Sequence, residues 1–456
     1  MPAADKPPAE EAVPPAEVGR GSAPLFWAQV AGNAGLLVAV VPITRELGPT
    51  GRGTLAFITV TAIVSATLAR LGVTEATTVF CAQRPRLRPA LLTNLILSVT
   101  AAALVAAAVV GGGLAMASGL RPPGLDTDEL VILAAAMVAS GLADAGYMFV
   151  LGCSRFRLHA LVTVTTAWVY AGAITLTAVT VGLTVASAAV IWIASQAVKA
   201  VVLLGAGVRA EGLAAPDARL LRESVAFGVR AWIGTLSSAF NERVDQILVA
   251  LIASEAALGL YATAVNGFEI LLYPAGAVAT AILPLAARAY PADRAARVVR
   301  AFRAVALLTL TGTVAAALLG PPLIPLVFGE DFDGSIAPFL WLLPGAIGFV
   351  ALAIFSNALV ASSAPGRSSA GPLVSLTLGL VLDLMLIPPY GASGAAAAAA
   401  SGLLAGGATA LVLYRRLERF PRRALFVPER GDLELLRALV RPSARAPRSP
   451  EPPAAT

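Results

Sequence analysis

Apolar residues along this 456-residue sequence gather into twelve long segments that short polar loops separate. Most segments hold about 20 residues or more with few charges, the length that an α-helix needs to cross a bilayer. They lack the alternation of apolar and polar residues over ~10 positions that marks the strands of a membrane β-barrel. The pattern therefore predicts an all-α membrane protein with about twelve spanning helices. The segments cover residues 23–44, 54–79, 90–118, 129–151, 160–182, 184–207, 224–252, 258–286, 302–328, 336–361, 371–388 and 393–414.

Composition supports this class. The mean hydropathy is +0.80, 57% of the residues are hydrophobic and 13% are charged. A soluble domain carries about 25% charged residues, so a soluble enzyme of this size is a poor match. The bias toward arginine, with Lys6 and Lys199 as the only lysines, and the high alanine content indicate a GC-rich bacterial genome.

Positive charge alternates from loop to loop. The two terminal tails and every second loop between them hold 26 of the 33 lysines and arginines, whereas the remaining loops hold only Arg45, Arg52 and Arg121. Cytoplasmic loops retain positive charge in this way. We therefore predict a multi-pass protein of the bacterial inner membrane with both termini in the cytoplasm. This topology also accounts for the net charge of +6 without a nucleic-acid partner.

The longest polar stretch inside the chain divides the helices into two sets of six. We predict an N-terminal six-helix lobe at 23–207, a cytoplasmic linker at 208–222 and a C-terminal six-helix lobe at 223–414. Residues 1–22 lack the basic start of a signal peptide and are predicted to be a disordered cytoplasmic tail. The tail at 415–456 begins with clustered arginines, which favours contact with anionic lipid headgroups.

A short internal echo supports two related lobes. Arg-Gly-Thr-Leu-Ala at 52–56 parallels Leu-Gly-Leu-Tyr-Ala at 258–262, and both follow a short loop predicted to be extracytoplasmic. Because six predicted helices separate them, the two repeats have the same orientation in the membrane, as in transporters with parallel halves.

Ten ionisable residues fall inside the predicted spans. Each costs ~2.5–3.5 kcal/mol near the bilayer centre, so ten facing lipid would cost on the order of 30 kcal/mol, more than the usual stability of a domain. Most must face one another or a wet cavity, which predicts a polar passage through the bundle. They are Arg70, Glu75, Asp144, Lys199, Arg230, Glu242, Arg243, Asp245, Glu269 and Asp383.

We divide nine of these residues between two roles. Each role has a plainer alternative. Glu269 could be a neutral, hydrogen-bonded side chain between helices, and Asp144 and Asp383 could be polar groups that only serve packing. Lys199 and Glu75 lie near predicted cytoplasmic ends and could extend to the headgroups. The predicted substrate-binding cations are Arg70, Lys199, Arg230 and Arg243, and the predicted coupling or ion-binding acids are Glu75, Asp144, Glu242, Asp245 and Glu269.

Catalytic chemistry finds little support. The single histidine and the two cysteines, Cys81 and Cys153, do not have the spacing of a metal site, and the cysteines are expected to be reduced cytoplasmic thiols. We predict no cofactor, although coupling to H⁺ or Na⁺ is possible. Asp126 and Asp128 form an acidic pair of the kind that membrane glycosyltransferases use to hold a metal, but we favour the interpretation that the pair only belongs to a negative extracytoplasmic loop. No nucleophile–base pair has a plausible spacing, so we predict that the protein is not an enzyme.

Several stretches resemble Wzx-type polysaccharide exporters of the multidrug/oligosaccharidyl-lipid/polysaccharide (MOP) exporter superfamily. Together they cover residues 24–414 in the order found in that family. Each motif is short, and their order and spacing carry the resemblance. The stretches are ELGPTGRG at 46–53, LGVTEAT at 71–77, RVDQIL at 243–248, ALGLYA at 257–262, IPLVFG at 324–329 and LIPPYGASGA at 386–395.

The resemblance implies a MATE-like fold of two six-helix lobes around a cleft that opens alternately to each side. It also implies a flippase that turns a polyprenyl-diphosphate-linked oligosaccharide from the inner to the outer leaflet, with polysaccharide assembly proteins as partners. The family often has Asn near position 383, where this chain has Asp383. A multidrug or metabolite cation antiporter of the same fold remains an alternative, because the ten charges include six acids. A membrane glycosyltransferase and an envelope scaffold are further alternatives.

Overall fold

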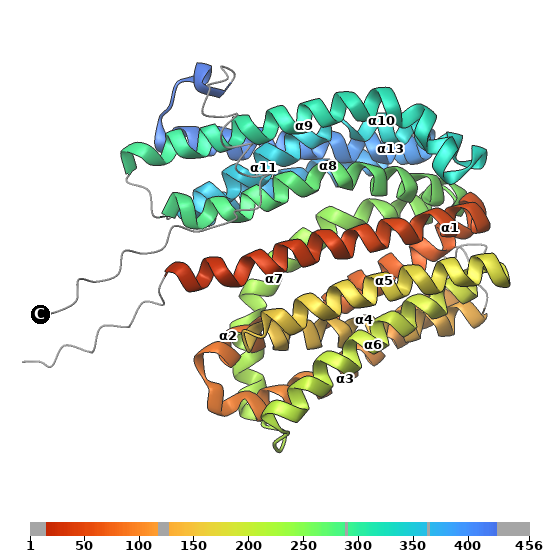
Figure 1. Cartoon of the computed structure of the whole chain (residues 1–456), viewed down its shortest axis with the longest axis vertical. Coiled ribbons are helices and arrows are strands. Elements are labelled where there is room, and N and C mark those ends of the chain that lie inside the picture. The colour runs from red at the N-terminus through yellow and green to blue at the C-terminus, as the bar shows by residue number, and fades with distance from the viewer. Residues whose placement is uncertain (1–14, 117–126, 288–290, 363–364, 426–456) are drawn as a thin grey trace, which may run out of the picture. The chain divides into compact units, whose positions relative to one another are not determined.

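The computed structural model describes residues 15–116, 127–287, 291–362 and 365–425 (Figure 1). Within these ranges the chain forms α-helices and three short 3₁₀ turns, and it contains no strand. The helices are α1 (Pro15–Ala69), α2 (Val73–Gln83), α3 (Arg88–Met116), α4 (Thr127–Gly152), α5 (Phe156–Thr180), α6 (Val185–Glu211), α7 (Ala218–Ile252), α8 (Glu255–Ala287), α9 (Pro291–Phe328), α10 (Ile336–Leu342), α11 (Gly345–Ala361), α12 (Pro365–Ser368) and α13 (Ala370–Glu418).

Ten of the twelve predicted segments coincide with a helix or with part of one, and the other two, 54–79 and 336–361, each span two consecutive helices. Among the described residues, eight helices are long and apolar enough to cross a membrane, and the pair α10–α11, bent by 48°, makes a ninth. Two of the eight, α1 and α13, each contain two predicted segments joined at a kink, at Gly48 and Gly391. The strongly charged α7 corresponds to the remaining segment. The prediction of an all-α, multi-pass membrane protein is confirmed.

The predicted segment 54–79 is not one helix. It breaks between the end of α1 and the start of α2, where Leu71 (φ 46°) and Gly72 (φ 79°) have left-handed backbone conformations. Glycine adopts this conformation without steric cost. The backbone of Gly72 also packs directly on that of Gly228 in α7, so a Cβ on either glycine would overlap the other residue. The indole Nε1 of Trp232 in α7 donates a hydrogen bond to the carbonyl oxygen of Thr67, at 2.7 Å. These contacts hold the break against α7.

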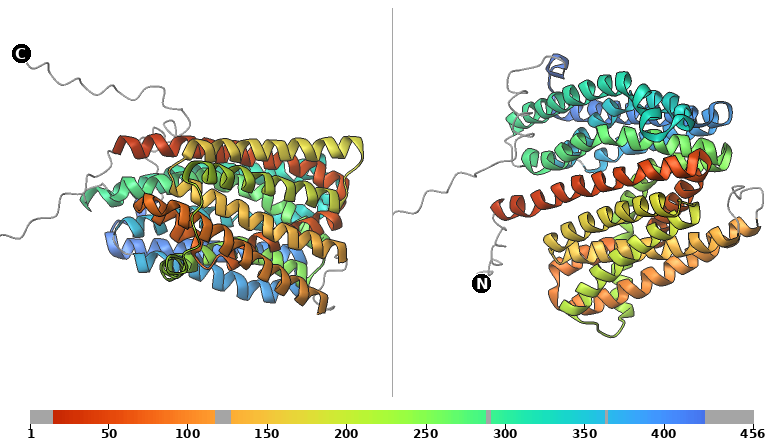
Figure 2. Two further views of the ribbon diagram at one scale, coloured as in Figure 1. Left: turned by 90° about the horizontal axis from the view of Figure 1, so that it is seen from below. Right: turned by 45° about the vertical axis from the view of Figure 1, so that its right-hand side comes forward.

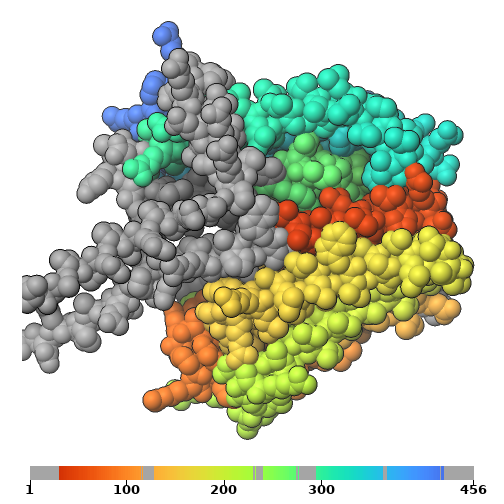
Figure 3. Space-filling model, in the orientation of Figure 1, coloured from red at the N-terminus to blue at the C-terminus, as the bar shows by residue number. Residues whose placement is uncertain are grey.

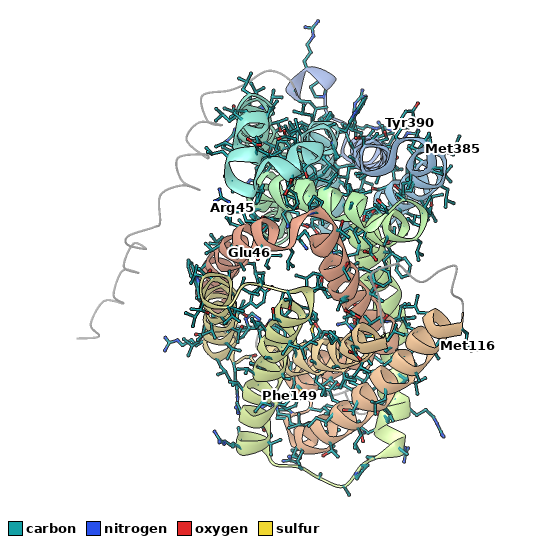
Figure 4. All side chains as sticks on the ribbon, turned by 90° about the vertical axis from the view of Figure 1, so that its right-hand side faces the viewer. Arg45, Glu46, Met116, Phe149, Met385 and Tyr390 are labelled. Atoms are coloured by element: carbon teal, nitrogen blue, oxygen red, sulfur yellow. The ribbon has the colours of Figure 1, made fainter. Side chains whose placement is uncertain are left out.

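The described residues fall into two compact units. Unit 1 comprises Met1–Asn266, Pro322–Pro338 and Asp383–Ala395, and unit 2 comprises Gly267–Pro321, Phe339–Leu382 and Ala396–Thr456. In unit 1, α3, α4, α5 and α6 run alongside one another, and α9, α11 and the later part of α13 do so in unit 2 (Figures 1 and 2). Phe149 lies inside unit 1 (Figure 4).

The same framework of buried residues occurs twice, the second time 206 or 207 positions later. Every buried residue of α6, for example, has a buried counterpart in α13. This register extends the short sequence echo to whole helices and confirms two parallel-related sets of six helices. Matched buried pairs include Leu92 and Val298, Leu95 and Ala301, Val99 and Val305, Phe149 and Phe355, and Leu203 and Ala410.

A carboxylate ties the helix ends together in each copy of the framework. Glu211, the last residue of α6, accepts a hydrogen bond from Arg155 at 3.0 Å and forms a salt bridge with Arg88 at 3.6 Å. In the second copy, Glu418 at the end of α13 accepts hydrogen bonds from Arg294 at 3.2 Å and from Ser362 at 3.0 Å. These three positions match in the same register, so the corner is part of the repeated framework.

The glycines of the sequence echo lie against each other. A Cβ at Gly53 would overlap the carbonyl group of Glu255, and a Cβ at Gly259 would overlap that of Pro49. The hydroxyl of Thr54 also donates to the carboxylate of Glu255, at 3.2 Å. The two similar stretches of sequence therefore lie at a close crossing of α1 and α8, which larger residues at these glycines would prevent.

Large apolar side chains are exposed along α5 and α6, including Leu161, Val169, Val179 and Val201. Figure 3 shows these two helices at the surface, α5 in yellow and α6 in yellow-green. Such a surface is unfavourable in water, whereas lipid tails are as apolar as the side chains themselves. This face is therefore suited to the hydrocarbon layer of the membrane.

Candidate functional site

A polar pocket lies within unit 1 between α1, α4 and α6, with a volume of about 170 Å³. Three charged residues line it: Arg70, which directly follows α1, Asp144 of α4 and Lys199 of α6. The break after Ala69 positions Arg70, because the helix ends there and its next residue turns toward α4. The remaining lining residues are Ile63, Ala66, Thr67, Ser140, Ala143, Tyr147 and Gln196. We call this the polar pocket.

Arg70 and Asp144 form a salt bridge in the polar pocket. Only 6% of the Arg70 side chain is exposed. Its second guanidinium nitrogen donates to the hydroxyl of Thr67 at 2.9 Å, while its buried Nε has no hydrogen-bond partner within the described part of the chain. The Asp144 side chain is 37% exposed, so the pair is buried on the arginine side only. Arg70 is therefore held by Asp144 but retains one donor that nothing in the pocket satisfies.

Lys199 contributes a second positive charge to the polar pocket. Its ammonium group donates to the side-chain oxygen of Gln196 at 3.1 Å. Asp144 is close enough to interact with it electrostatically, yet no salt bridge involving Lys199 occurs among the residues of known placement. The lining thus has two cations and one carboxylate. Glu75, from α2, adds a second negative charge near Asp144 and accepts a hydrogen bond from Thr74 at 2.7 Å.

The repeated framework provides an internal control for these charges. In the second copy, the positions that correspond to Arg70, Asp144 and Lys199 hold Gly276, Val350 and Gly406. Val350 is fully buried in the core of unit 2. The second copy therefore packs with Val350 and Gly406 where the first has Asp144 and Lys199, so the fold itself does not require those two charges. Gly276 lies inside the continuous helix α8 and is no such control for Arg70.

A second group of buried charges, the aspartate cluster, joins α7, α8 and α13. The hydroxyl of Tyr261 donates a hydrogen bond to the carboxylate of Asp245. Asp383 is 2% exposed, interacts electrostatically with Asp245, and has one buried carboxylate oxygen without a partner in the described ranges. Arg243 is near Tyr261, and Arg52 of α1 is within electrostatic range of Arg243.

The aspartate cluster is also confined to one copy of the framework. The positions that correspond to Asp245 and Tyr261 hold Ala39 and Leu55, which are both buried. The two carboxylates and the phenol supply oxygen atoms only, which suits a proton or a hard cation such as Na⁺.

The other predicted site residues lie elsewhere. Glu242 is exposed on α7, and Glu269 is partly buried on α8. Arg230 belongs to α7, but its side chain lies outside the described residues. Asp126 also lies outside them, and Asp128 is exposed in the first turn of α4.

Sequence reasoning missed the uncharged residues of the polar pocket, although the sequence carries a signal for them. Thr67, Ser140 and Gln196 each stand three or four positions before a charged residue of the pocket. On a helix, residues at this spacing share one face. A neutral polar residue one turn from each intramembrane charge therefore marks the helix face that lines the pocket.

The sequence from residue 43 to residue 337 matches the family described as polysaccharide biosynthesis protein. No curated protein matches the chain. A lipid II flippase MurJ in an inward closed conformation has a similar structure, with a TM-score of 0.69, 13% identity and coverage of 92% of this chain and 91% of that one.

Multidrug transporters share the fold as well. An inward-facing MATE family transporter of the MOP superfamily gives a TM-score of 0.63 at 13% identity, covering 85% of this chain and 94% of its own. A MOP superfamily transporter from Pyrococcus furiosus, described as having a binding pocket of reversed polarity, gives 0.57 at 13%, with coverage of 88% and 95%. At these identities the likeness shows the fold alone, and the family match adds the biosynthetic context. The chain belongs to the polysaccharide biosynthesis protein family and is a multi-pass membrane protein with the fold that MurJ and MATE transporters share.

Proposed function

We propose that the protein is a flippase that moves a polyprenyl-diphosphate-linked oligosaccharide from the inner to the outer leaflet of the bacterial inner membrane. The observation that carries this proposal is the polar pocket, where Lys199 has no salt bridge and Arg70 has an unsatisfied donor. Phosphate groups pair favourably with both, since arginine offers a fork of donors and lysine a compact charge. The family match to polysaccharide biosynthesis supports a glycan-bearing substrate.

The size of the polar pocket limits which part of the substrate it can hold. Its 170 Å³ is room for about five water molecules at ~30 Å³ each. A phosphate group fits such a space, but an oligosaccharide or a polyprenyl chain does not. We propose that the pocket binds one phosphate of the diphosphate, while the glycan and the lipid are accommodated elsewhere.

A reconstituted system tests this function directly. The purified protein is placed in liposomes that contain a polyprenyl-diphosphate-linked oligosaccharide with a fluorescent sugar, and an impermeant quencher reports the exposed leaflet. We expect the protein to accelerate exchange between leaflets for the diphosphate-linked lipid but not for the same lipid without phosphate. Acceleration of organic-cation uptake in the absence of lipid exchange would instead identify the cation antiporter.

The aspartate cluster is the observation that favours the antiporter, because an organic cation could bind its carboxylates. In the flippase we propose a different role for it, as the site where H⁺ or Na⁺ binds and couples transport to an ion gradient. Glu269 and Glu75 remain further coupling candidates, and Arg230 and Arg243 remain candidates for diphosphate contact. The basic tail at 415–456 remains a proposed contact for anionic headgroups.

Asp383→Asn preserves the shape of the side chain but removes its charge from the aspartate cluster. We expect the variant to flip substrate at the basal rate and to lose the acceleration, about tenfold or more, that a favourable pH or Na⁺ gradient gives the wild type, since ~1.4 kcal/mol of lost coupling corresponds to a factor of ten. Flipping is measured with and without each gradient. Asp331→Asn, at an exposed acid, is the control and should behave as wild type. An unchanged gradient response in Asp383→Asn would remove the cluster from ion coupling.

The proposed orientation, with both termini in the cytoplasm, is tested through the two cysteines. Cys153 is partly exposed and Cys81 is buried. An impermeant maleimide should leave intact cells unlabelled, label Cys153 readily once the membrane is permeabilised, and label Cys81 only after unfolding. Rapid labelling of Cys153 in intact cells would reverse the orientation.

A further inference from the structure

The only two cysteines of the chain lie beside each other, although 72 positions separate them. Cys81 belongs to α2 and is fully buried, and Cys153 follows the last residue of α4. A side-chain hydrogen bond links the two thiols. The helices cross closely at this point, because a Cβ on Gly152 would lie 3.1 Å from the Cβ of Cys81. The hydroxyl of Thr78 also donates to the carbonyl oxygen of Met148, at 3.1 Å.

The surroundings of the two thiols differ in a way that favours oxidation. The hydrogen bond from Cys81 lowers the pKa of the Cys153 thiol, and the positive charges of Arg88 and Arg155 lower it further, against the opposing effects of partial burial and of the Glu211 carboxylate. The same hydrogen bond, together with burial, raises the pKa of Cys81. Thiolates are the reactive form of cysteine. Cys153 is thus the more accessible and more nucleophilic thiol, and Cys81 is a protonated neighbour.

The fold does not need sulfur at this corner. In the second copy of the framework, the positions that correspond to Cys81 and Cys153 hold Ala287 and Leu359. The Glu418 corner of that copy forms with Arg294 and Ser362, just as Glu211 forms its corner with Arg88 and Arg155. Packing alone therefore does not account for a pair of adjacent thiols in the first copy.

We propose that Cys81 and Cys153 are a redox-active pair that closes reversibly into an intramolecular disulfide. The oxidant is a peroxide. The Cys153 thiolate attacks one peroxide oxygen, the O–O bond breaks, and Cys153 becomes a sulfenic acid while the other oxygen leaves as hydroxide or alkoxide. The Cys81 sulfur then attacks the sulfenic sulfur, forming the S–S bond and releasing the oxygen as water, which takes up the proton of Cys81. Oxidation-sensing cysteines are typically accessible, of low pKa and next to a resolving thiol.

The cross-link joins α2 to the end of α4. Helix α2 also packs on α7, through Phe80 and Phe227 at a ring-centroid distance of 5.0 Å and, at its start, through Gly72 and Gly228. The disulfide therefore restrains a helix that contacts three others. Closing a long loop of chain also reduces the freedom of the unfolded state. Oxidation should therefore raise the thermal unfolding midpoint of the full-length protein.

The test uses the full-length purified protein in detergent with a small excess of hydrogen peroxide. Free thiols are counted by gel shift with a polymer-linked maleimide after denaturation, and the linked peptides are identified by mass spectrometry without reduction. We expect the wild type to lose both thiols together, to yield the peptide pair containing Cys81 and Cys153, to gain thermal stability, and to recover both thiols with dithiothreitol.

Two single variants assign the roles of the thiols. Cys81→Ser should accumulate a sulfenic acid at Cys153, trapped by dimedone, whereas Cys153→Ser should keep its remaining thiol through the same treatment. Sulfinic acid at Cys153 with Cys81 still free in the wild type would overturn the proposal. So would disulfides only between separate molecules, or equally fast oxidation of Cys81 in Cys153→Ser.

Discussion

Lys199→Ala is expected to lower the flipping rate by about 10- to 100-fold while the protein remains folded. The ammonium group has no salt bridge in the polar pocket, so its removal leaves no carboxylate without its partner. A hydrogen bond to a charged group contributes ~1.5–3 kcal/mol, and each 1.4 kcal/mol corresponds to about a factor of ten. The reduction should appear at substrate concentrations below saturation, because the lost contact is one of binding. Flipping is measured in the liposome assay described above.

Three further variants sharpen this result. Lys199→Arg keeps the positive charge and should retain part of the activity, and Lys199→Gln should behave like Lys199→Ala. Arg209→Ala removes an exposed cation from the same helix and should flip at the wild-type rate. Wild-type flipping by Lys199→Ala at limiting substrate would show that the polar pocket does not hold the phosphate.

Variants of the salt bridge between Arg70 and Asp144 distinguish an effect on stability from an effect on substrate binding. Arg70→Ala leaves the Asp144 carboxylate without its partner. Because that side chain is 37% exposed, the loss of stability should be smaller than the ~3–5 kcal/mol that breaking a fully buried pair costs. Combining it with Asp144→Ala removes the stranded charge and should restore most of the stability but not the flipping. Such a stable, inactive double variant is the outcome expected if Arg70 contacts phosphate.

Gly72→Ala is expected to destabilise the protein more than an alanine at either of two other glycines, Gly205 and Gly228. The new Cβ would overlap the backbone of Gly228 in α7, and neither backbone can rotate away as a side chain can. The left-handed φ of 79° adds strain for alanine, ~1–2 kcal/mol. Overpacking alone typically costs about 1–3 kcal/mol. We therefore expect a clear fall in the thermal unfolding midpoint of the purified protein.

Matched glycine variants separate the two causes. Gly205→Ala is the control, because a Cβ at this position of α6 meets no atom within 4 Å. It should be neutral or slightly stabilising, by about 0.5–1 kcal/mol. Gly228→Ala meets the same overlap as Gly72→Ala from a helical backbone, so it reports the close contact without the strain. If Gly72→Ala unfolded at the same temperature as Gly205→Ala, the contact between α2 and α7 would not constrain the protein.

Hydropathy was sufficient to predict the helices because the bilayer imposes the same requirement on every span. The break at Leu71 and Gly72 escaped this reasoning, since a break held by a neighbouring backbone leaves the apolar pattern of 54–79 unchanged. The break also shapes the candidate site, because it ends α1 one residue before Arg70.

The cost of burying charge led to Arg70, Asp144 and Lys199, which the structure brings together in one pocket, but it did not predict how they pair. Arg70 and Asp144 are 74 positions apart, and no local pattern links them. Lys199 was predicted as a substrate-binding cation, with a side chain extended to the headgroups as the alternative; the structure places it in the lining of the polar pocket. The pairing of Asp245 with Tyr261 likewise depends on how α7 and α8 pack, which a single sequence does not specify.

The repeated framework has an evolutionary consequence. A chain whose two halves share one register of buried residues retains the mark of gene duplication, after which both copies stayed under selection for packing. The charges of the polar pocket and of the aspartate cluster stand at positions where the other copy holds glycine, alanine, valine or leucine. The two copies thus carry their buried charges at different places. Where one copy carries a buried charge, the other copy thus preserves a form of the ancestral scaffold that folds without that charge.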